Sequence, residues 1–94
     1  CLWLGCNSMS RRKVRSAEGL RFGEAMRRLR KERGLSQEAL AEAANLTADY
    51  IGFIERGENV PTLTVILKVA GALDVDACDL LADFKLSVIR RLFR

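Results

Sequence analysis

The chain has 94 residues, enough for one small domain with a single hydrophobic core but too few for two such cores. Hydrophobic residues make up 49% and charged residues 30%, which indicates a globular chain and argues against intrinsic disorder. A single proline and the lack of β-branched runs favour an all-α fold, and no apolar run approaches the roughly 18 residues of a membrane-spanning helix, so no membrane partner is expected.

Charge is divided unevenly along the chain, although the formal net charge is only +4. Residues 9–34 carry ten basic and three acidic side chains, residues 35–83 carry two and nine, and residues 84–94 carry four and none. A partner with dense negative charge would therefore be met mainly by the first of these segments and secondarily by the last.

The chain lacks the residue sets of common metal and catalytic sites. Cys1, Cys6 and Cys78 form no CxxC pair and there is no histidine, which argues against a zinc site or a disulfide framework. We expect Cys78 to be a buried free thiol, which suits a reducing cytoplasm. No nucleophile stands beside a base and no glycine-rich phosphate loop is present, so neither enzymatic activity nor a cofactor is expected.

Residues 1–16 are predicted to form an N-terminal extension with a basic arm. Met9 resembles a natural start, so residues 1–8 are left out of the functional interpretation. The basic run SRRKVR, residues 10–15, is of the kind that condenses on phosphate or reaches into a minor groove, and it includes Arg11, Arg12 and Lys13. A solvated tail would have the same composition.

A first long helix is predicted from Ala17 to Arg33. Phe22, Met26 and Leu29 step by four and three residues along one face, which is the expected core side. Gly34 would end the helix. Basic side chains lie largely on its other faces, where they would either follow a DNA backbone or form a solvated surface: Arg27, Arg28 and Lys31.

Residues 35–57, LSQEALAEAANLTADYIGFIERG, indicate two short helices joined by a three-residue turn. Ser36 and Thr47 are preferred N-cap residues at the two helix starts, and Gly57 supplies the C-terminal stop. Asn45 enters the left-handed region at low cost, which suits a sharp turn. Two helices joined by so short a turn form the helix-turn-helix plan, in which the second helix enters the DNA major groove.

Two further helices are predicted after the single proline. The fourth would begin at an N-cap Thr62 and stop at Asp74, and its apolar positions are spaced to bury a broad stripe: Leu63, Ile66, Leu67, Ala70 and Leu73. A short fifth helix through residues 80–81 would close the core. Asp76 and Asp79 before it resemble a capping box.

Residues 84–94, FKLSVIRRLFR, place apolar side chains at helical spacing in a basic segment and are expected to form a further amphipathic helix. Three explanations compete: packing on its own domain or a second subunit, docking in the groove of another protein, and insertion into a membrane surface. Three helical turns are too few for a stable isolated helix, so we favour packing against a second copy of the chain.

The segment from Leu29 to Leu81 closely resembles the phage repressor and Cro type of helix-turn-helix domain, the lambda-repressor-like fold of the XRE family. Four features carry the resemblance together: the LSQ that opens helix two, the Tyr-Ile pair in helix three, the IERG at its end and the Pro-Thr-Leu entry to helix four. The resemblance implies a compact five-helix DNA-binding domain at residues 17–83, with an additional short C-terminal helix at residues 84–94. Helix three, Thr47 to Arg56, would be the recognition helix.

The resemblance also implies contacts to the DNA backbone. Gln37 matches the position whose side chain holds a phosphate in the family, at the positive end of helix two. Arg56 matches another backbone-contacting position, and Asn59 in the following loop is a secondary candidate. Tyr50 would either present its hydroxyl to a phosphate or be partly buried.

A structural ion pair is implied as well. Glu55 resembles the family's buried acid that pairs with an arginine of helix one, which here is Arg30. We expect this pair to stabilise the domain and not to contact DNA, because removing one partner would leave a poorly solvated charge.

The residues that would face base edges offer no arginine, glutamine or asparagine for a bidentate contact to guanine or adenine: Ala48, Asp49, Gly52 and Phe53. Ala48 and Phe53 can touch thymine methyl groups. Asp49 can accept from cytosine N4 or serve only as an acid at the positive end of the helix dipole, and Thr47 could serve a base or a phosphate. Specificity is therefore expected to depend on DNA shape and on the basic arm more than on many direct bonds.

These features imply a sequence-specific transcriptional regulator that binds operator DNA as a homodimer, with helix three of each copy in the major groove. In length the chain resembles the controller proteins of restriction-modification systems and compact phage repressors. Such a protein is expected in the cytoplasm, associated with the nucleoid. The alternative is an antitoxin or adaptor that uses the same fold mainly to bind a second protein partner.

Overall fold

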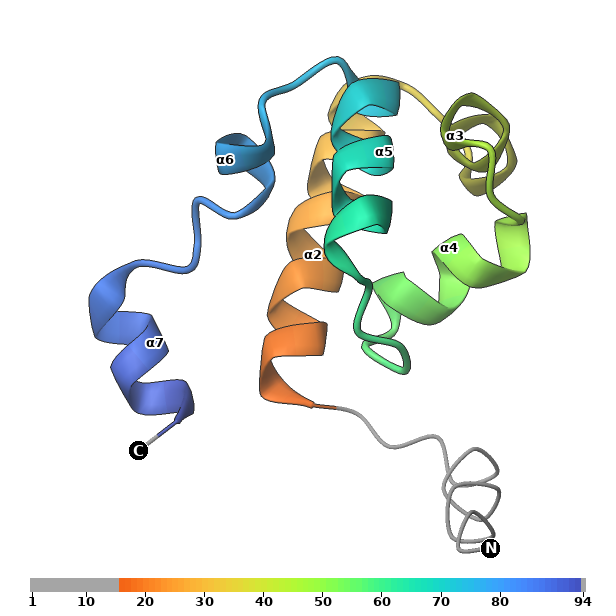
Figure 1. The fold of residues 1–94 in the computed structure, drawn as a ribbon. Helices are drawn as coiled ribbons and strands as arrows, with labels where there is room; N and C mark the ends of the chain where they lie inside the picture. Colours follow the sequence, from red (N-terminus) through yellow and green to blue (C-terminus); the bar gives the residue numbers. More distant parts are fainter. Residues whose placement is uncertain (1–15, 94) are drawn as a thin grey trace, which may run out of the picture.

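The structure is a computed structural model that describes residues 16–93, and this range contains six helices and no strand. The helices follow one another as α2 (Ala17–Glu32), α3 (Gln37–Ala44), α4 (Ala48–Glu55), α5 (Leu63–Leu73), α6 (Ala77–Leu80) and α7 (Leu86–Leu92) (Figure 1). The predicted all-α domain of five helices with an additional C-terminal helix is therefore confirmed. The basic arm with Arg11, Arg12 and Lys13 lies outside the described residues.

A serine or threonine begins each of the first four helices. Its hydroxyl accepts a hydrogen bond from the backbone N–H three residues later, at 3.0 to 3.4 Å: Ser16 from Gly19, Ser36 from Ala39, Thr47 from Tyr50 and Thr62 from Val65. Each such cap stabilises a helix by about 1 kcal/mol, because it satisfies an amide that has no partner inside the helix. The caps predicted at the starts of α3, α4 and α5 are confirmed.

The same four helices also end alike. The residue just past each helix adopts the left-handed conformation, with φ between 59° and 78°, at Gly34, Asn45, Gly57 and Asp74. The next amide then donates to the carbonyl five residues earlier, as Glu58 does to Phe53 at 2.9 Å and Leu46 to Ala41 at 2.8 Å. This is the Schellman arrangement, and it turns the chain sharply at each predicted stop.

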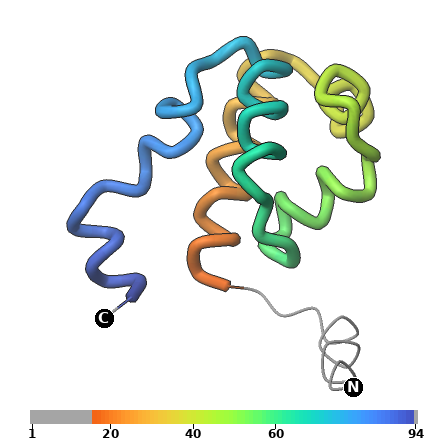
Figure 2. The backbone as a smooth tube through the Cα atoms, in the orientation of Figure 1, coloured from red at the N-terminus to blue at the C-terminus, as the bar shows by residue number. Residues whose placement is uncertain are grey.

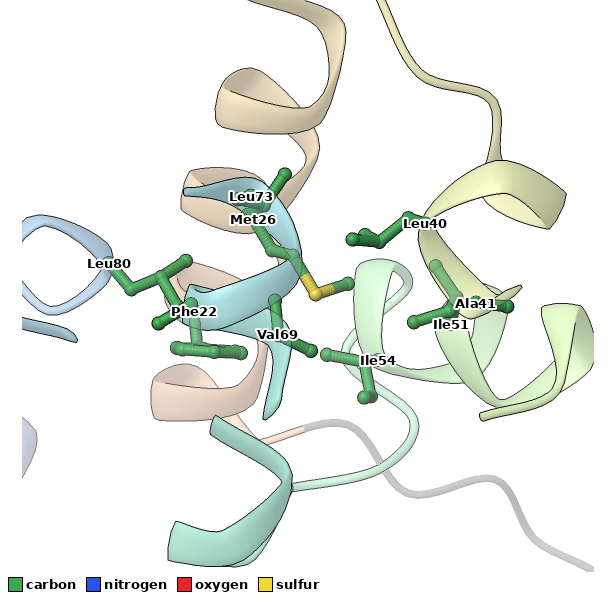
Figure 3. Close-up of a cluster of buried hydrophobic side chains, with 10 residues drawn as sticks. Phe22, Met26, Leu40, Ala41, Ile51, Ile54, Val69, Leu73 and Leu80 are labelled. Atoms are coloured by element: carbon green, nitrogen blue, oxygen red, sulfur yellow. The ribbon is translucent and has the colours of Figure 1, made fainter. Parts of the chain in front are cut away.

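The core lies where α4 packs across α2 and where α3 packs on both α4 and α5. The short α6 closes the core against α2 and α5, as the path of the chain in Figure 2 shows. Figure 3 shows how side chains from all five helices meet there. Ten buried apolar residues form this cluster: Phe22, Met26, Leu40, Ala41, Ile51, Ile54, Val69, Ala70, Leu73 and Leu80.

Helices α2 and α4 approach closely because α2 has glycine at the crossing. A β carbon on Gly23 would overlap the carbonyl oxygen of Ile54 and lie 2.8 Å from that of Glu55. One turn earlier, a β carbon on Gly19 would lie 3.3 Å from the carbonyl oxygen of Gly57. The end of α4 is thus seated directly on the backbone of α2.

The predicted buried stripe of α5 was partly wrong. Leu63 is 67% exposed and Leu67 is 52% exposed, whereas Val69 is fully buried. The buried positions of α5 are Val69, Ala70 and Leu73, so the predicted stripe missed Val69 and two of its leucines remain in contact with solvent.

Two expectations for α6 were also wrong. Cys78 is exposed, because Leu80 turns to the core and a residue two positions away lies roughly 200° around a helix. Asp76 precedes α6 but its side chain makes no capping hydrogen bond. The Asp79 amide donates instead to the Asp76 backbone carbonyl at 2.9 Å, so the backbone satisfies the donor that a capping box would use.

The last helix stands apart from the core. Helix α7 lies beyond α6 and has no buried residue (Figure 1). Phe84, just before it, is half-buried and packs against the core. The side chain of Phe84 therefore belongs to the packed domain, and the separate element begins after it.

Candidate nucleic-acid interface

Helices α3 and α4 are joined by a turn whose shape is set by local chemistry. Asn45 has φ 59° and directs the Leu46 amide back to the Ala41 carbonyl. Thr47 follows and caps α4 through the amide of Tyr50 at 3.1 Å. The angle between the two helices is therefore fixed within three residues, as the helix-turn-helix plan requires.

Helix α4 has a buried side and an exposed side. Ile51 and Ile54 are fully buried in the core. Asp49, Gly52, Phe53 and Arg56 follow one another at i, i+3, i+4 and i+7, which places them on one common face. We call these four residues the outer face of α4.

The predicted DNA-contact residues in α4, at its N-cap and in the loop after it differ in exposure. Thr47 and Asp49 are exposed at the start of α4. Ala48 and Tyr50 are half-buried and pack against the core, so partial burial describes Tyr50. Asn59 is half-buried in the loop that follows α4.

On the outer face, Arg56 folds back along the helix. Its guanidinium carbon lies 5.2 Å from the centre of the Phe53 ring, within cation–π range. Its Nη1 would lie only 3.0 Å from a β carbon on Gly52, so Gly52 is covered by this side chain and is itself buried. Gly52 was expected to face a base edge, but the Arg56 guanidinium occupies that place.

Glu58 holds the same guanidinium from the loop. Arg56 donates from Nε to Glu58 Oε2 at 3.2 Å and from Nη2 to Oε1 at 3.4 Å. The Glu58 side chain is only 9% exposed, so one partner of this pair is fixed within the fold. Glu58 was not predicted to belong to this surface, although the glycine stop before it indicates that the chain turns back there.

Behind the outer face, Arg30 and Glu55 form the predicted ion pair. Arg30 donates from Nε to Glu55 Oε2 at 2.6 Å and from Nη2 to Oε1 at 3.1 Å, and both side chains are at most 10% exposed. The third nitrogen, Nη1, donates to the Leu35 carbonyl at 2.8 Å. The pair therefore ties together α2, the start of α3 and the end of α4.

Gln37 joins this network from the first turn of α3. Its Nε2 donates to Glu55 Oε1 at 3.0 Å. An amide nitrogen carries two hydrogens, so one remains beyond the hydrogen bond to Glu55. The side chain is thus held at the N-terminus of α3, where backbone amides also point outward.

The described residues contain neither a candidate metal site nor a candidate membrane-spanning helix. Within residues 16–93, no group of three or more potential ligands among His, Cys, Asp and Glu could hold a metal ion. In the same range, no helix has the length and apolar character needed to cross a membrane.

Comparisons with known proteins agree with this geometry. A protein-family model described as "Helix-turn-helix" matches residues 26–80. The chain is 45% identical over 53 residues to the immunity repressor protein of Bacillus phage phi105, and this match covers 56% of the chain but only 37% of the phage protein. It is 34% identical over 59 residues to the uncharacterized HTH-type transcriptional regulator YazB of Bacillus subtilis, covering 63% of the chain and 86% of YazB.

A solved structure is similar over the same region. The restriction-modification controller protein C.AhdI from Aeromonas hydrophila superposes with a TM-score of 0.67 and 44% sequence identity. The match covers 68% of this chain and 97% of the controller protein. The shared part is therefore close to a whole domain of the known protein, and about a third of this chain lies outside it.

Proposed function

The chain belongs to the helix-turn-helix family of DNA-binding transcriptional regulators, and from this premise we propose that it is a repressor that binds operator DNA as a homodimer. Helix α4 of each copy would lie in the major groove of one half-site. The observation that carries the proposal is the outer face of α4, on which Asp49 and Arg56 are exposed while Ile51 and Ile54 hold the opposite face in the core. On the outer face itself, Phe53 is half-buried and Gly52 is covered by the Arg56 side chain.

Backbone contacts would fix the register of the protein on the duplex. Gln37 is the first candidate, because its second amide hydrogen and the N-terminus of α3 together suit a phosphate oxygen. Thr47 can donate its hydroxyl hydrogen while its oxygen caps α4. Tyr50 and Asn59, both half-buried, would contribute from the edges of the same surface.

Attraction to DNA would come mainly from outside α3 and α4. Residues 35–57 contain four acids and a single arginine, so the helix-turn-helix is itself negative. Residues 9–34 carry ten basic side chains, including the arm with Arg11, Arg12 and Lys13. We propose that this segment supplies the salt-dependent part of binding, while Ala48, Asp49 and Phe53 discriminate between sequences.

The exposed apolar side chains of α7 and its C-cap support dimerisation. None of the seven residues of α7 is fully buried in a single chain, although Val88 and Leu92 are half-buried. Leu86 and, just after the helix, Phe93 are 60% and 67% exposed. So short a helix is marginal in water without a partner, and a second copy of the chain would cover its apolar side. Two weak half-site contacts joined in this way would make operator binding tight and steeply dependent on protein concentration.

Selection of DNA from a random pool with the purified protein tests this function. A palindromic site is expected, with half-site centres about 10 base pairs apart or a multiple of that spacing. Its binding constant should fall steeply with salt, because basic side chains release counterions from the phosphates.

A different result would reject this function. Failure to enrich any DNA at low salt, together with salt-insensitive capture of one protein partner, would reject the regulator and support the antitoxin or adaptor. A regulator of this kind would act in the cytoplasm at the nucleoid.

A further inference from the structure

The outer face of α4 presents a problem of recognition. None of its first three residues, Asp49, Gly52 and Phe53, can donate two hydrogen bonds to one base. Arg56 lies one turn further on, at the end of the helix, where the family resemblance assigns a phosphate contact. The structure nevertheless places its guanidinium over Gly52, in the middle of the outer face.

We propose that Arg56 is a specificity-determining residue that reads a guanine in each half-site. Gly52 leaves the space that the Arg56 guanidinium needs to reach this position. This inference rests on the proposed binding of α4 in the major groove. It assigns to the folded-back arginine the base contact that no side chain in the middle of α4 can make.

The Arg56 guanidinium can lie over Gly52 because this residue has no side chain. A β carbon there would lie 3.0 Å from Nη1 of Arg56, 3.8 Å from its guanidinium carbon and 3.9 Å from Nη2. An alanine at this position would move Nη1 by a few tenths of an ångström, and a longer side chain would displace the guanidinium further. Helix propensity alone would favour alanine at this position by about 1 kcal/mol, so the glycine has a cost that the position of Arg56 accounts for.

Two groups then orient the guanidinium. Phe53 provides the flat surface, with the guanidinium carbon 5.2 Å from the ring centre. Glu58 binds the edge formed by Nε and Nη2, at 3.2 and 3.4 Å. A guanidinium has five N–H donors in a rigid plane, so the edge formed by Nη1 and the outer hydrogen of Nη2 remains for a ligand.

That remaining edge matches guanine. Guanine presents two acceptors, O6 and N7, in the major groove, and a bidentate contact from arginine is the commonest specific contact to DNA. Adenine offers a donor at the place of O6, which would oppose the same edge. A phosphate would also accept two hydrogen bonds, so phosphate binding is the competing role that the experiment must separate.

The experiment starts from the site selected by the unmodified protein. Binding constants are measured for this site and for a matched set of sites, each with one G·C pair of the half-site changed to A·T. The variants are Arg56→Ala and Gly52→Ala. Arg33→Ala is the matched control, because Arg33 is an exposed arginine whose guanidinium contacts the Asp74 carbonyl, at the ends of α2 and α5.

We expect one G·C position at which the unmodified protein discriminates by about 10-fold or more. Arg56→Ala should reduce discrimination at that position to about 1 and leave the other positions unchanged. Gly52→Ala should weaken discrimination at the same position. The melting temperature of the domain should not fall in this variant, because alanine is the better helix former. Arg33→Ala should keep the full pattern of discrimination between sites, and any loss of affinity should be equal at every site, because Arg33 belongs to the basic segment proposed to attract DNA.

Two outcomes would overturn the inference while leaving the regulator intact. One is a selected site without an invariant G·C pair in each half. The other is an Arg56→Ala variant that binds every site more weakly by the same factor, with a salt slope reduced by about 1, which is the behaviour of a phosphate contact. Failure to select any DNA would reject the regulator itself.

Discussion

Gly23 of α2 lies so close to Ile54 of α4 that a side chain at this glycine would overlap the Ile54 backbone carbonyl. This contact sets the spacing between α2 and α4. The obstacle is the backbone of α4, which cannot rotate aside as a side chain can. The crossing therefore depends on a single missing methyl group.

Gly23→Ala should lower the free energy of unfolding by roughly 2 to 3 kcal/mol, because α4 must move away from α2. For a domain of this size the melting temperature should fall by about 10 °C or more. The matched control is Gly71→Ala in α5, where a β carbon meets nothing within 4 Å. That variant should melt at the same temperature or slightly higher, since alanine favours helix. Equal melting temperatures for the two variants would contradict the close crossing.

Glu55→Gln should destabilise the domain by about 3 kcal/mol, since Arg30 would keep a buried charge without its counter-charge. Thermal unfolding followed by circular dichroism measures the effect. Glu42→Gln removes an exposed acid from α3 and should change stability by less than about 0.5 kcal/mol. If the two variants unfold alike, the buried pair contributes no more than a surface charge.

Asp74→Gly should stabilise the domain by roughly 0.5 to 1 kcal/mol. Asp74 adopts φ 59°, where glycine has no steric penalty, and its carboxylate lies at the negative end of the α5 dipole. Asp74→Asn separates the two causes, because it removes the charge but keeps a side chain, and it should give a smaller gain. Denaturant unfolding is the measurement, and lower stability of both variants would refute this account.

Replacing both Leu86 and Phe93 with aspartate should convert the proposed dimer to a monomer that remains folded, because both side chains are exposed in the single chain. Sedimentation equilibrium over a range of concentrations gives the association constant. Leu63→Asp with Leu67→Asp is the comparison, since these leucines form the other exposed apolar stretch, on α5. Loss of dimer only in the α5 variant would assign the interface to α5 and leave α7 without that role.

Local chemistry made much of this fold predictable from the sequence. The caps at Ser36, Thr47 and Thr62 and the stops at Asn45 and Asp74 involve hydrogen bonds that span at most six residues. The residue type at such a position largely decides the backbone conformation. The helix-turn-helix could therefore be located before any tertiary contact was known. The pairing of Arg30 with Glu55 followed from the family resemblance.

Burial was less predictable, because it depends on neighbours that are distant in sequence. Periodicity placed Leu67 on the apolar side of α5, but it could not show that the side buried by the neighbouring helices is the side of Val69. The exposure of Cys78 follows in the same way from the direction in which Leu80 points. Gly19 and Gly23 are four residues apart in α2, but a glycine has no side chain that an apolar pattern would count, and the crossing of α4 explains Gly23.

The outer face of α4 shows the same division most clearly. From the sequence we could predict a recognition helix whose central positions have no side chain suited to guanine or adenine. The position of the Arg56 guanidinium could not be predicted in this way, because it depends on the space at Gly52 and on the carboxylate of Glu58, which the folded chain brings together. A side chain with many rotamers is placed by its surroundings, whereas a turn is placed by its own residues.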